Sequence, residues 1–158
     1  MHEDGVVRAI HVAAEQGDPV EPRETVRAVA GRGLRGDRYF DGTGTFADRA
    51  GSDLTLIERE ALAAVERDHG LDLDPGVHRR NLTTEGVALN HLVGERFRVG
   101  EAVCVGTEPC EPCAYLERHL GREGVREALV HRGGLRARVV DGGRIGVGDT
   151  LQPPKPGD

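Results

Sequence analysis

Two cysteines, Cys110 and Cys113, lie three positions apart at the expected start of a helix. Pro112 comes between them, and proline favours the first helical position because its missing N–H would have no partner there. Cys113 would then lie in the first turn, where the helix dipole favours a thiolate over a thiol. Three nearby carboxylates oppose that effect: Glu108, Glu111 and Glu117. The segment therefore predicts a reactive thiol if arginines from elsewhere in the chain converge on it.

Other roles for these cysteines stay open on spacing alone. Cys113 shares a helical face with Leu116 and Leu120, as a small buried hydrophobe would. Cys110 and Cys113 also have the spacing of a redox dithiol, although no βαβ pattern of thioredoxin type surrounds them. They could supply half of a zinc site with His119 or His131, but the sequence has no second CxxC and no HxxxH. Cys104 lies in an apolar run and is expected in the core.

Length and composition limit the class of protein. The 158 residues predict one domain over 1–152, followed by a flexible proline-rich tail over 153–158. The chain has 21 basic and 27 acidic residues and a net charge of −6, which disfavours nucleic acid and anionic membranes as partners. Three cysteines without a secreted spacing, no signal-peptide pattern and no long apolar run predict a cytoplasmic protein.

The pattern of elements predicts a mainly β protein. Glycine makes up 23 of 158 residues, and several short β-branched runs alternate with turns, which favours an antiparallel or mixed, curled sheet. Strands or extended segments are expected at 6–13, 25–30, 53–57, 78–84, 96–99, 102–107, 135–140, 144–147 and 149–152. Helices are expected at 58–69, 88–93, 114–120 and 122–131.

Two glycine-rich stretches need separate interpretation. Residues 31–36 satisfy GxGxxG after a strand, but the residues that follow contain helix breakers and no apolar 3.6 period. A dinucleotide site needs a helix at that point, so we reject that reading. Residues 40–53 form a long Gly/Asp-rich stretch, which we treat as a candidate lid.

Four separated motifs together resemble one known family. They are Gly33-Leu34-Arg35-Gly36-Asp37-Arg38, then Arg79-Arg80-Asn81-Leu82 with Thr84, Gly86 and Leu89, then Cys110-Glu111-Pro112-Cys113, and Gly134-Leu135-Arg136-Ala137-Arg138-Val139 with Gly146-Val147-Gly148-Asp149. In this order and spacing the chain resembles the MOSC family, domains similar to the C-terminal part of molybdenum cofactor sulfurases. The resemblance implies a small, strongly bent β-barrel with three to four short peripheral helices.

The resemblance also implies a pocket for the molybdenum cofactor, an anionic pterin with a phosphate and a soft metal end. Cys113 is the implied molybdenum ligand or sulfur carrier, with Cys110 in a supporting or neutral role. Asn81 would meet the pterin edge, and Asp37 would either contact the cofactor or bond nearby backbone as a turn residue. The family often has histidine where this chain has Tyr39. The guanidinium donors expected around the anion are Arg38, Arg79, Arg80, Arg136 and Arg138.

The implied activity is oxidoreductase chemistry on small N-hydroxylated compounds, or sulfur relay to another molybdoenzyme. Relay would need a separate cysteine desulfurase as donor, since 158 residues leave no room for a pyridoxal-phosphate domain. Pyridoxal phosphate is therefore not expected on this chain. The sequence is compatible with both activities.

Overall fold

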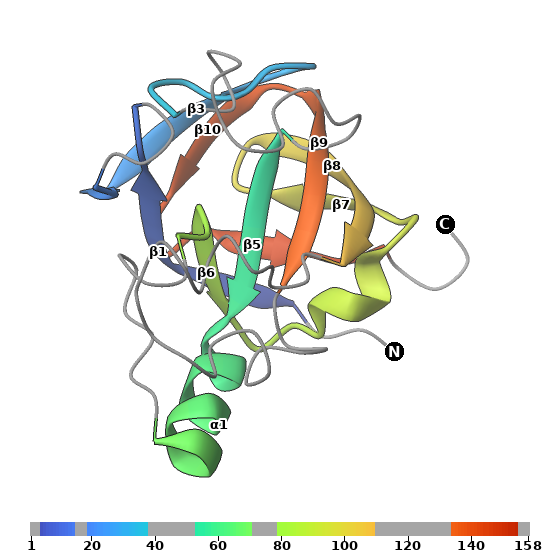
Figure 1. Ribbon diagram of the computed structural model, residues 1–158. Helices are drawn as coiled ribbons and strands as arrows, with labels where there is room; N and C mark the ends of the chain where they lie inside the picture. The colour runs from blue at the N-terminus through green and yellow to red at the C-terminus, as the bar shows by residue number, and fades with distance from the viewer. Residues whose placement is uncertain (1–3, 15–18, 38–52, 71–78, 110–133, 155–158) are drawn as a thin grey trace.

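The computed structural model describes residues 4–14, 19–37, 53–70, 79–109 and 134–154. These residues form a β-barrel with a small second sheet at one end and a helix at the other (Figure 1). The strands are β1 (Gly5–Val12), β2 (Glu21–Arg23), β3 (Thr25–Val29), β4 (Gly33–Leu34), β5 (Leu54–Glu58), β6 (Leu82–Glu85), β7 (Arg96–Val99), β8 (Ala102–Pro109), β9 (Leu135–Asp141), β10 (Gly143–Gly146) and β11 (Thr150–Gln152). The helices are α1 (Arg59–His69) and the 3-10 turn η1 (Leu89–Leu92).

The barrel closes through seven of the described strands. Their order is β11-β7-β8-β9-β5-β6-β1, and β11 also pairs with β1, so the ring has no open edge there. Strand β2 lies outside this ring, beside β1. All the barrel pairings are antiparallel except β5–β6, which is parallel. A parallel pair needs a crossover connection, and α1 lies on the chain between these two strands.

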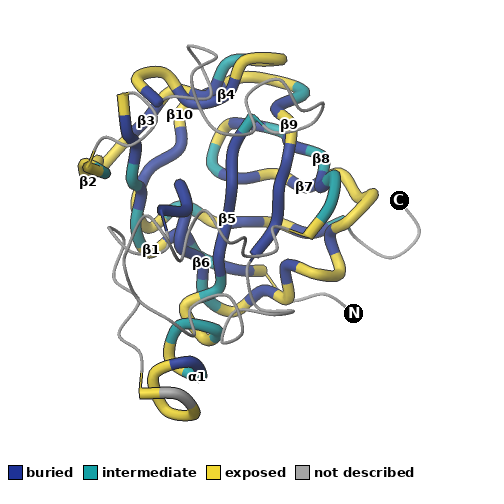
Figure 2. The backbone as a smooth tube through the Cα atoms, viewed as in Figure 1, coloured by how far each residue is buried: buried dark blue, intermediate teal, exposed yellow. Residues whose placement is uncertain are grey.

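The barrel interior is filled by aliphatic side chains that alternate along the strands. In β1 the buried core positions are Val7, Ile10 and Val12. A bulge between Val7 and Ala9 changes which residues of the strand face inward, from odd to even positions. Figure 2 shows burial along nearly all of β5 and along the first part of β9, which lie in the middle of the wall. The second sheet, of order β10-β3-β4, adds Val26 and Ile145 to the same core.

The predicted fold class, a mainly β barrel, is confirmed. The predicted strands occur with small boundary shifts, except that the extended segment expected at 78–84 forms a strand only over β6, and α1 ends at Gly70, whose positive φ of 67° suits glycine. The sequence missed β2 and β4, which have only three and two residues. The helix expected over 88–93 is only the 3-10 turn η1, so the described residues contain fewer helices than expected.

Several predictions fall on other parts of the chain. The helices expected at 114–120 and 122–131, nearly all of the candidate lid and the end of the tail lie outside the described residues. Residues 31–37 contain turns and the short strand β4. The segment before β6 is not extended throughout, because Arg79 has a φ of +60°. No helix among the described residues is both long enough and apolar enough to span a bilayer.

Candidate functional site

Polar side chains form one row across the barrel wall, over neighbouring strands. Strand register sets the row, since Glu108 of β8 and Thr55 of β5 both pair with Arg136 of β9. Hydrogen bonds extend it from Thr55 to Asn81, just before β6, and from Asn81 to His11 of β1. We call these five residues the polar row.

The polar row lies on the outer face of the barrel wall. Arg136 alternates with Leu135 and Ala137, and both neighbours belong to the hydrophobic core. Because side chains of a strand point to opposite faces in turn, Arg136 must point away from that core. It is nevertheless only 4% exposed, and Thr55 and Asn81 are also buried. Three buried polar side chains on the outer face of a barrel wall are unusual and indicate a functional site.

Asn81 holds three strands together at the centre of the polar row. Its Oδ1 accepts hydrogen bonds from the backbone N and from Oγ1 of Thr55, at 3.0 and 3.2 Å. Its Nδ2 donates to the carbonyl of His11 at 3.1 Å. The backbone N of Asn81 also donates to Oγ1 of Thr55. These bonds occupy Oδ1 and one Nδ2 hydrogen, so the geometry favours a positioning role for Asn81 at the site.

Arg136 and Glu108 form an ion pair at the end of the polar row. Nε of Arg136 lies 3.6 Å from Oε1 of Glu108, and Oγ1 of Thr107 donates to the backbone carbonyl of Arg136. A bulge between Gly106 and Glu108 interrupts the β8–β9 ladder at this point. Bulges re-aim side chains and occur often beside active sites. Strand β8 ends one residue before Cys110.

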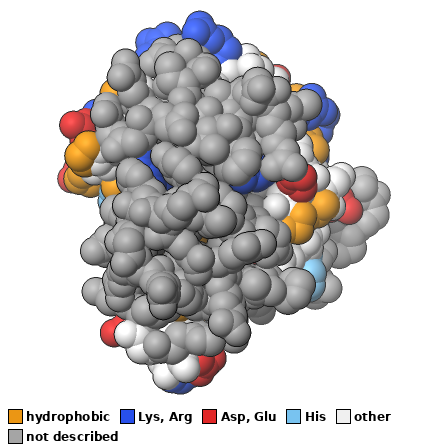
Figure 3. Space-filling view, in the orientation of Figure 1, with side chains coloured by type: hydrophobic (Ala, Val, Ile, Leu, Met, Phe, Trp, Pro, Cys, Tyr) orange, Lys and Arg blue, Asp and Glu red, His pale blue; other side chains and the backbone are white. Residues whose placement is uncertain are grey.

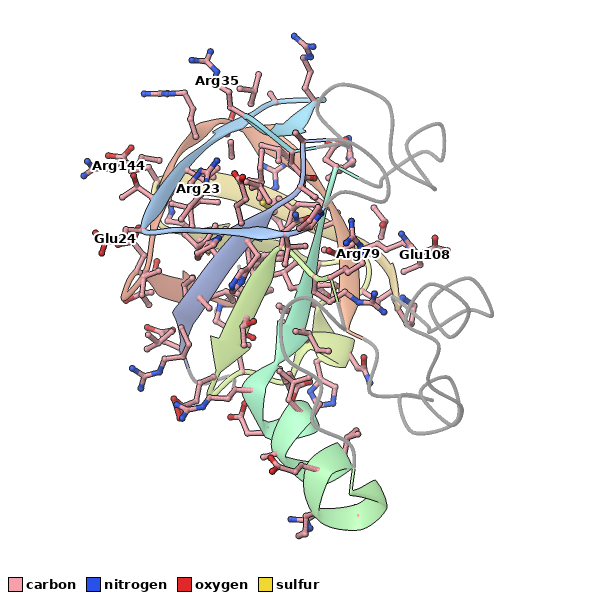
Figure 4. All side chains as sticks on the ribbon, turned by 60° about the vertical axis from the view of Figure 1, so that its left-hand side comes forward. Arg23, Glu24, Arg35, Arg79, Glu108 and Arg144 are labelled. Atoms are coloured by element: carbon pink, nitrogen blue, oxygen red, sulfur yellow. The ribbon has the colours of Figure 1, made fainter. Side chains whose placement is uncertain are left out.

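Two more buried arginines, Arg79 and Arg80, are neighbours of the row in the sequence. Each is only 8% exposed, and they directly precede Asn81. The left-handed backbone of Arg79 is costly for a residue with a side chain and is found most often at functional sites. Figure 4 shows Arg79 and Glu108 on the same side of the barrel.

Arg138 differs from the buried arginines. It points to the same face of β9 as Arg136, as the sequence predicted, but its side chain is exposed. It lies near Asp53, whose Oδ2 accepts a hydrogen bond from the backbone N of Val139 at 2.9 Å. Burial raises the pKa of Asp53, while this hydrogen bond and the charge of Arg138 partly oppose the rise. Arg138 therefore lies at the margin of the buried group.

Asp37 is fully buried at the end of β1. Its Oδ1 accepts a hydrogen bond from the backbone N of Ala13 at 3.0 Å. Ala13 follows His11 by two residues, so Asp37 lies beside the His11 end of the polar row. This bond joins residues far apart in sequence, whereas the turn role weighed for Asp37 would have used neighbouring backbone.

His11, Thr55 and the pairing of Glu108 are the parts of the site that sequence reasoning missed. His11 is half-buried, and its Nδ1 has no hydrogen-bond partner among the described residues. Burial lowers the pKa of this imidazole below its usual value of 6.5. The alternation of β1, with Ile10 and Val12 in the core, is the signal that could have placed His11 on the outer face.

The group of charges suits an anion. Among the described residues, the site includes three buried arginines, Arg79, Arg80 and Arg136, and two carboxylates, Asp37 and Glu108. Guanidinium groups bind phosphate and carboxylate through paired hydrogen bonds. The predicted site residues Arg38, Cys110 and Cys113 lie outside the described residues.

No cluster of three or more His, Cys, Asp or Glu side chains that could hold a metal occurs in the described part of the chain. Cys104 is fully buried, as predicted, and burial raises the pKa of its thiol to about 12. This thiol is therefore protonated at neutral pH and is not a nucleophile.

The family model for the MOSC domain matches residues 41–152 of the chain. The chain belongs to the MOSC domain family. The match covers β5 through β11, and so includes all of the polar row except His11. The predicted family resemblance is therefore confirmed.

Solved structures agree on the fold of this MOSC protein. The YuaD protein from Bacillus subtilis superposes with a TM-score of 0.77 at 15% identity, with 96% of each chain covered. YiiM from Escherichia coli gives 0.67 at 19% identity, covering 98% of this chain and 70% of its own. YiiM from Geobacillus stearothermophilus gives 0.71 at 18% identity, covering 97% and 76%. At these identities the likeness concerns the fold. No curated protein sequence gave a significant match.

Proposed function

We propose that this MOSC protein binds the molybdenum cofactor against the polar row and uses Cys113 as molybdenum ligand or sulfur carrier. The observation that carries the proposal is the burial of Arg79, Arg80 and Arg136 outside the hydrophobic core. Guanidinium groups bind phosphate through paired hydrogen bonds, so buried arginines outside the hydrophobic core suit an anionic ligand. The phosphate of the pterin cofactor is such an anion.

The chain connectivity supports a role for Cys113. Pro109 ends β8 opposite Leu135, the neighbour of Arg136. Cys113 follows four residues later, and four residues of chain span at most about 14 Å. A thiol within that reach of the arginines would have its thiolate form stabilised by their charge. When bound, the cofactor would supply a metal centre capable of oxygen-atom or sulfur chemistry.

The residues of the row have separate tasks in this proposal. Arg79, Arg80 and Arg136 bind the anionic part of the cofactor, with Arg38 as a further donor and Arg138 at the margin. Asn81 and Thr55 fix the strands that carry these groups. Asp37 anchors the end of β1, and Glu108 orients Arg136.

Two activities follow from the same site. One is reduction of small N-hydroxylated compounds; the other is sulfur relay, with a cysteine desulfurase as donor and a molybdoenzyme as acceptor. Purification without reductant, followed by intact-mass and elemental analysis, separates them. Relay predicts an adduct of about 32 Da on Cys113, the mass of one persulfide sulfur. Reduction predicts bound molybdenum and turnover of an N-hydroxylated substrate with a supplied electron donor. Protein with neither adduct nor molybdenum, from cells that make the cofactor, would refute the proposal.

The thiol–disulfide alternative rests on the CxxC spacing of Cys110 and Cys113. It predicts a reversible disulfide between these two residues and reductase turnover without metal. The zinc alternative predicts one zinc per chain. The same elemental analysis therefore distinguishes molybdenum, zinc and a metal-free dithiol.

A further inference from the structure

A second group of arginines lies away from the polar row, on the small sheet. Figure 3 shows basic side chains gathered at the end of the molecule where β3 and β10 lie in Figure 1. There, a hollow of about 290 Å³ is lined by six residues. They are Arg23, Thr25, Val26, Arg27, Arg35 and Arg144, and we call this the arginine hollow.

Strand pairing places the arginines of the hollow. Arg27 of β3 pairs directly with Arg144 of β10. Both are exposed, while Val26 and Ile145 beside them are buried, so the arginines share the outer face of this sheet. Arg35 is brought in by its backbone N, which donates to the carbonyl of Arg27 at 2.9 Å.

One of the four arginines of the hollow forms an ion pair among the described residues. Arg23 pairs with Glu21 at 2.9 Å. Arg27, Arg35 and Arg144 form no ion pair in the part of the chain that the structure describes.

Two neighbouring carboxylates are engaged with backbone. Glu101 accepts from the backbone N of Arg144 at 2.9 Å, and Asp149 accepts from that of Gly146 at 2.8 Å. Like charges opposite each other across strands destabilise a sheet. The chain has a net charge of −6 and yet places Arg27 opposite Arg144, which indicates that this pair of arginines has a functional role.

We propose that the arginine hollow binds a phosphate group, either as free phosphate or on a small phosphorylated molecule. The guanidinium groups of Arg27, Arg35 and Arg144 supply paired N–H donors that match phosphate oxygens. The hydroxyl of Thr25 adds a neutral donor, and buried Val26 forms an apolar floor. The volume is at the small end of ligand pockets and suits a phosphate with a small attached group.

The arginine hollow is separate from the candidate cofactor site. In Figure 4 the labelled Arg35 and Arg144 lie on the opposite side of the view from Arg79 and Glu108. Filling this site therefore leaves the polar row unobstructed.

Binding is tested by calorimetric titration of the full chain with inorganic phosphate, pyrophosphate and adenosine monophosphate at constant ionic strength. We expect a Kd in the millimolar range or tighter for at least one of them. Arg27→Gln and Arg144→Gln should each weaken it by roughly tenfold, and Arg27→Lys by less, because lysine keeps the charge but loses the paired donors. Arg96→Gln, at an exposed position of β7, removes the same charge and should change the Kd by less than about twofold.

The ligands distinguish the sources of the phosphate. Tighter binding of adenosine monophosphate than of inorganic phosphate indicates a phosphorylated metabolite; equal or weaker binding indicates the free ion. Binding of polyglutamate with no binding of any phosphate would overturn the proposal in favour of an acidic protein partner. Equal losses in Arg27→Gln and Arg96→Gln would also overturn it, because general charge attraction would then explain the data.

Thermal unfolding gives a second readout on the same variants. Without phosphate at low salt, Arg27→Gln should raise the Tm, because it removes one of two like charges that face each other across the strands. With saturating phosphate, wild type should gain stability and the advantage of the variant should disappear. A variant that keeps its advantage in phosphate would contradict the proposed site.

Discussion

Arg136 and Glu108 face each other across β9 and β8, with Nε and Oε1 3.6 Å apart, at the end of the strand that leads to Cys110. Their environments are unequal: the side chain of Arg136 is 4% exposed and that of Glu108 is 39% exposed. The carboxylate can therefore be solvated without its partner, whereas the guanidinium group cannot. The pair orients a buried cation at one end of the polar row.

Glu108→Gln should lower the free energy of unfolding by about 1 kcal/mol. Breaking a fully buried ion pair costs more than this, but here solvent screens the exposed carboxylate of Glu108 and reduces the cost. Urea unfolding of Glu108→Gln, Arg136→Gln and the double variant measures the coupling. A coupling energy near zero in this cycle would mean that the two side chains do not interact in solution.

Asn81→Ala should be among the most destabilising substitutions in the site. It removes three side-chain hydrogen bonds and leaves buried groups of Thr55 and His11 without partners, at a cost of roughly 3 kcal/mol. Thr55→Val is the graded comparison. It removes the hydroxyl but keeps the backbone bond to Oδ1 of Asn81, and should cost about 1 kcal/mol. Equal losses in the two variants, by urea unfolding, would contradict the central role of Asn81.

His11 should make stability depend on pH. Burial lowers its pKa in the folded state below the unfolded value of 6.5, so the unfolded chain binds the proton first as pH falls. The contribution of neutral His11 to the free energy of unfolding is fully present above pH 6.5. It is lost as the pH falls from 6.5 through the pKa of His11 in the folded state.

The difference between the free energies of unfolding of wild type and His11→Gln, wild type minus variant, should therefore decrease as the pH falls below 6.5. Taking the difference cancels carboxyl groups such as Asp53 and Glu58, whose raised pKa values act with the opposite sign. Parallel pH profiles for the two proteins would show that His11 is not buried as the structure has it.

The sequence predicted the barrel because its strands alternate apolar and polar residues and are separated by glycine turns. It placed Arg136 and Arg138 correctly on one face, since that follows from alternation within one strand. It did not predict that Arg136 is buried and Arg138 is exposed, because burial depends on which distant parts of the chain pack over each position. Arg79, Arg80 and Asn81 were proposed from the family motif, and in the structure Asn81 bonds to Thr55, which pairs with Arg136.

The site residues that the sequence did not predict also depend on contacts between distant parts of the chain. Thr55 and His11 belong to the row only because β5 and β1 are its neighbours in space, and strand order cannot be read from periodicity. Glu108 was treated as a carboxylate that opposes a thiolate, since its partner across the β8–β9 ladder depends on register. The bulge at that point shifts the register by an amount that composition does not reveal.

Gly134 should resist substitution because it sets the entry to β9. Its φ of +104° is unfavourable for other residues, and an added Cβ would overlap the carbonyl oxygen of Leu56. Gly134→Ala should therefore cost more than about 3 kcal/mol, the sum of backbone strain and this overlap. Gly148→Ala is the matched control: its φ is +93°, but the added Cβ meets nothing within 4 Å. It should cost about 1 kcal/mol, and equal losses would contradict the close approach at Gly134.

Molybdenum content per chain tests the central claim most directly. Protein expressed with intact cofactor synthesis should contain about one molybdenum per chain, measured by elemental mass spectrometry. Cys113→Ser and Arg136→Gln should each lose most of it while remaining folded by circular dichroism, and the exposed-arginine control Arg96→Gln should keep it. Full metal in Cys113→Ser and Arg136→Gln would contradict the account, as would wild-type protein with neither molybdenum nor the persulfide adduct on Cys113.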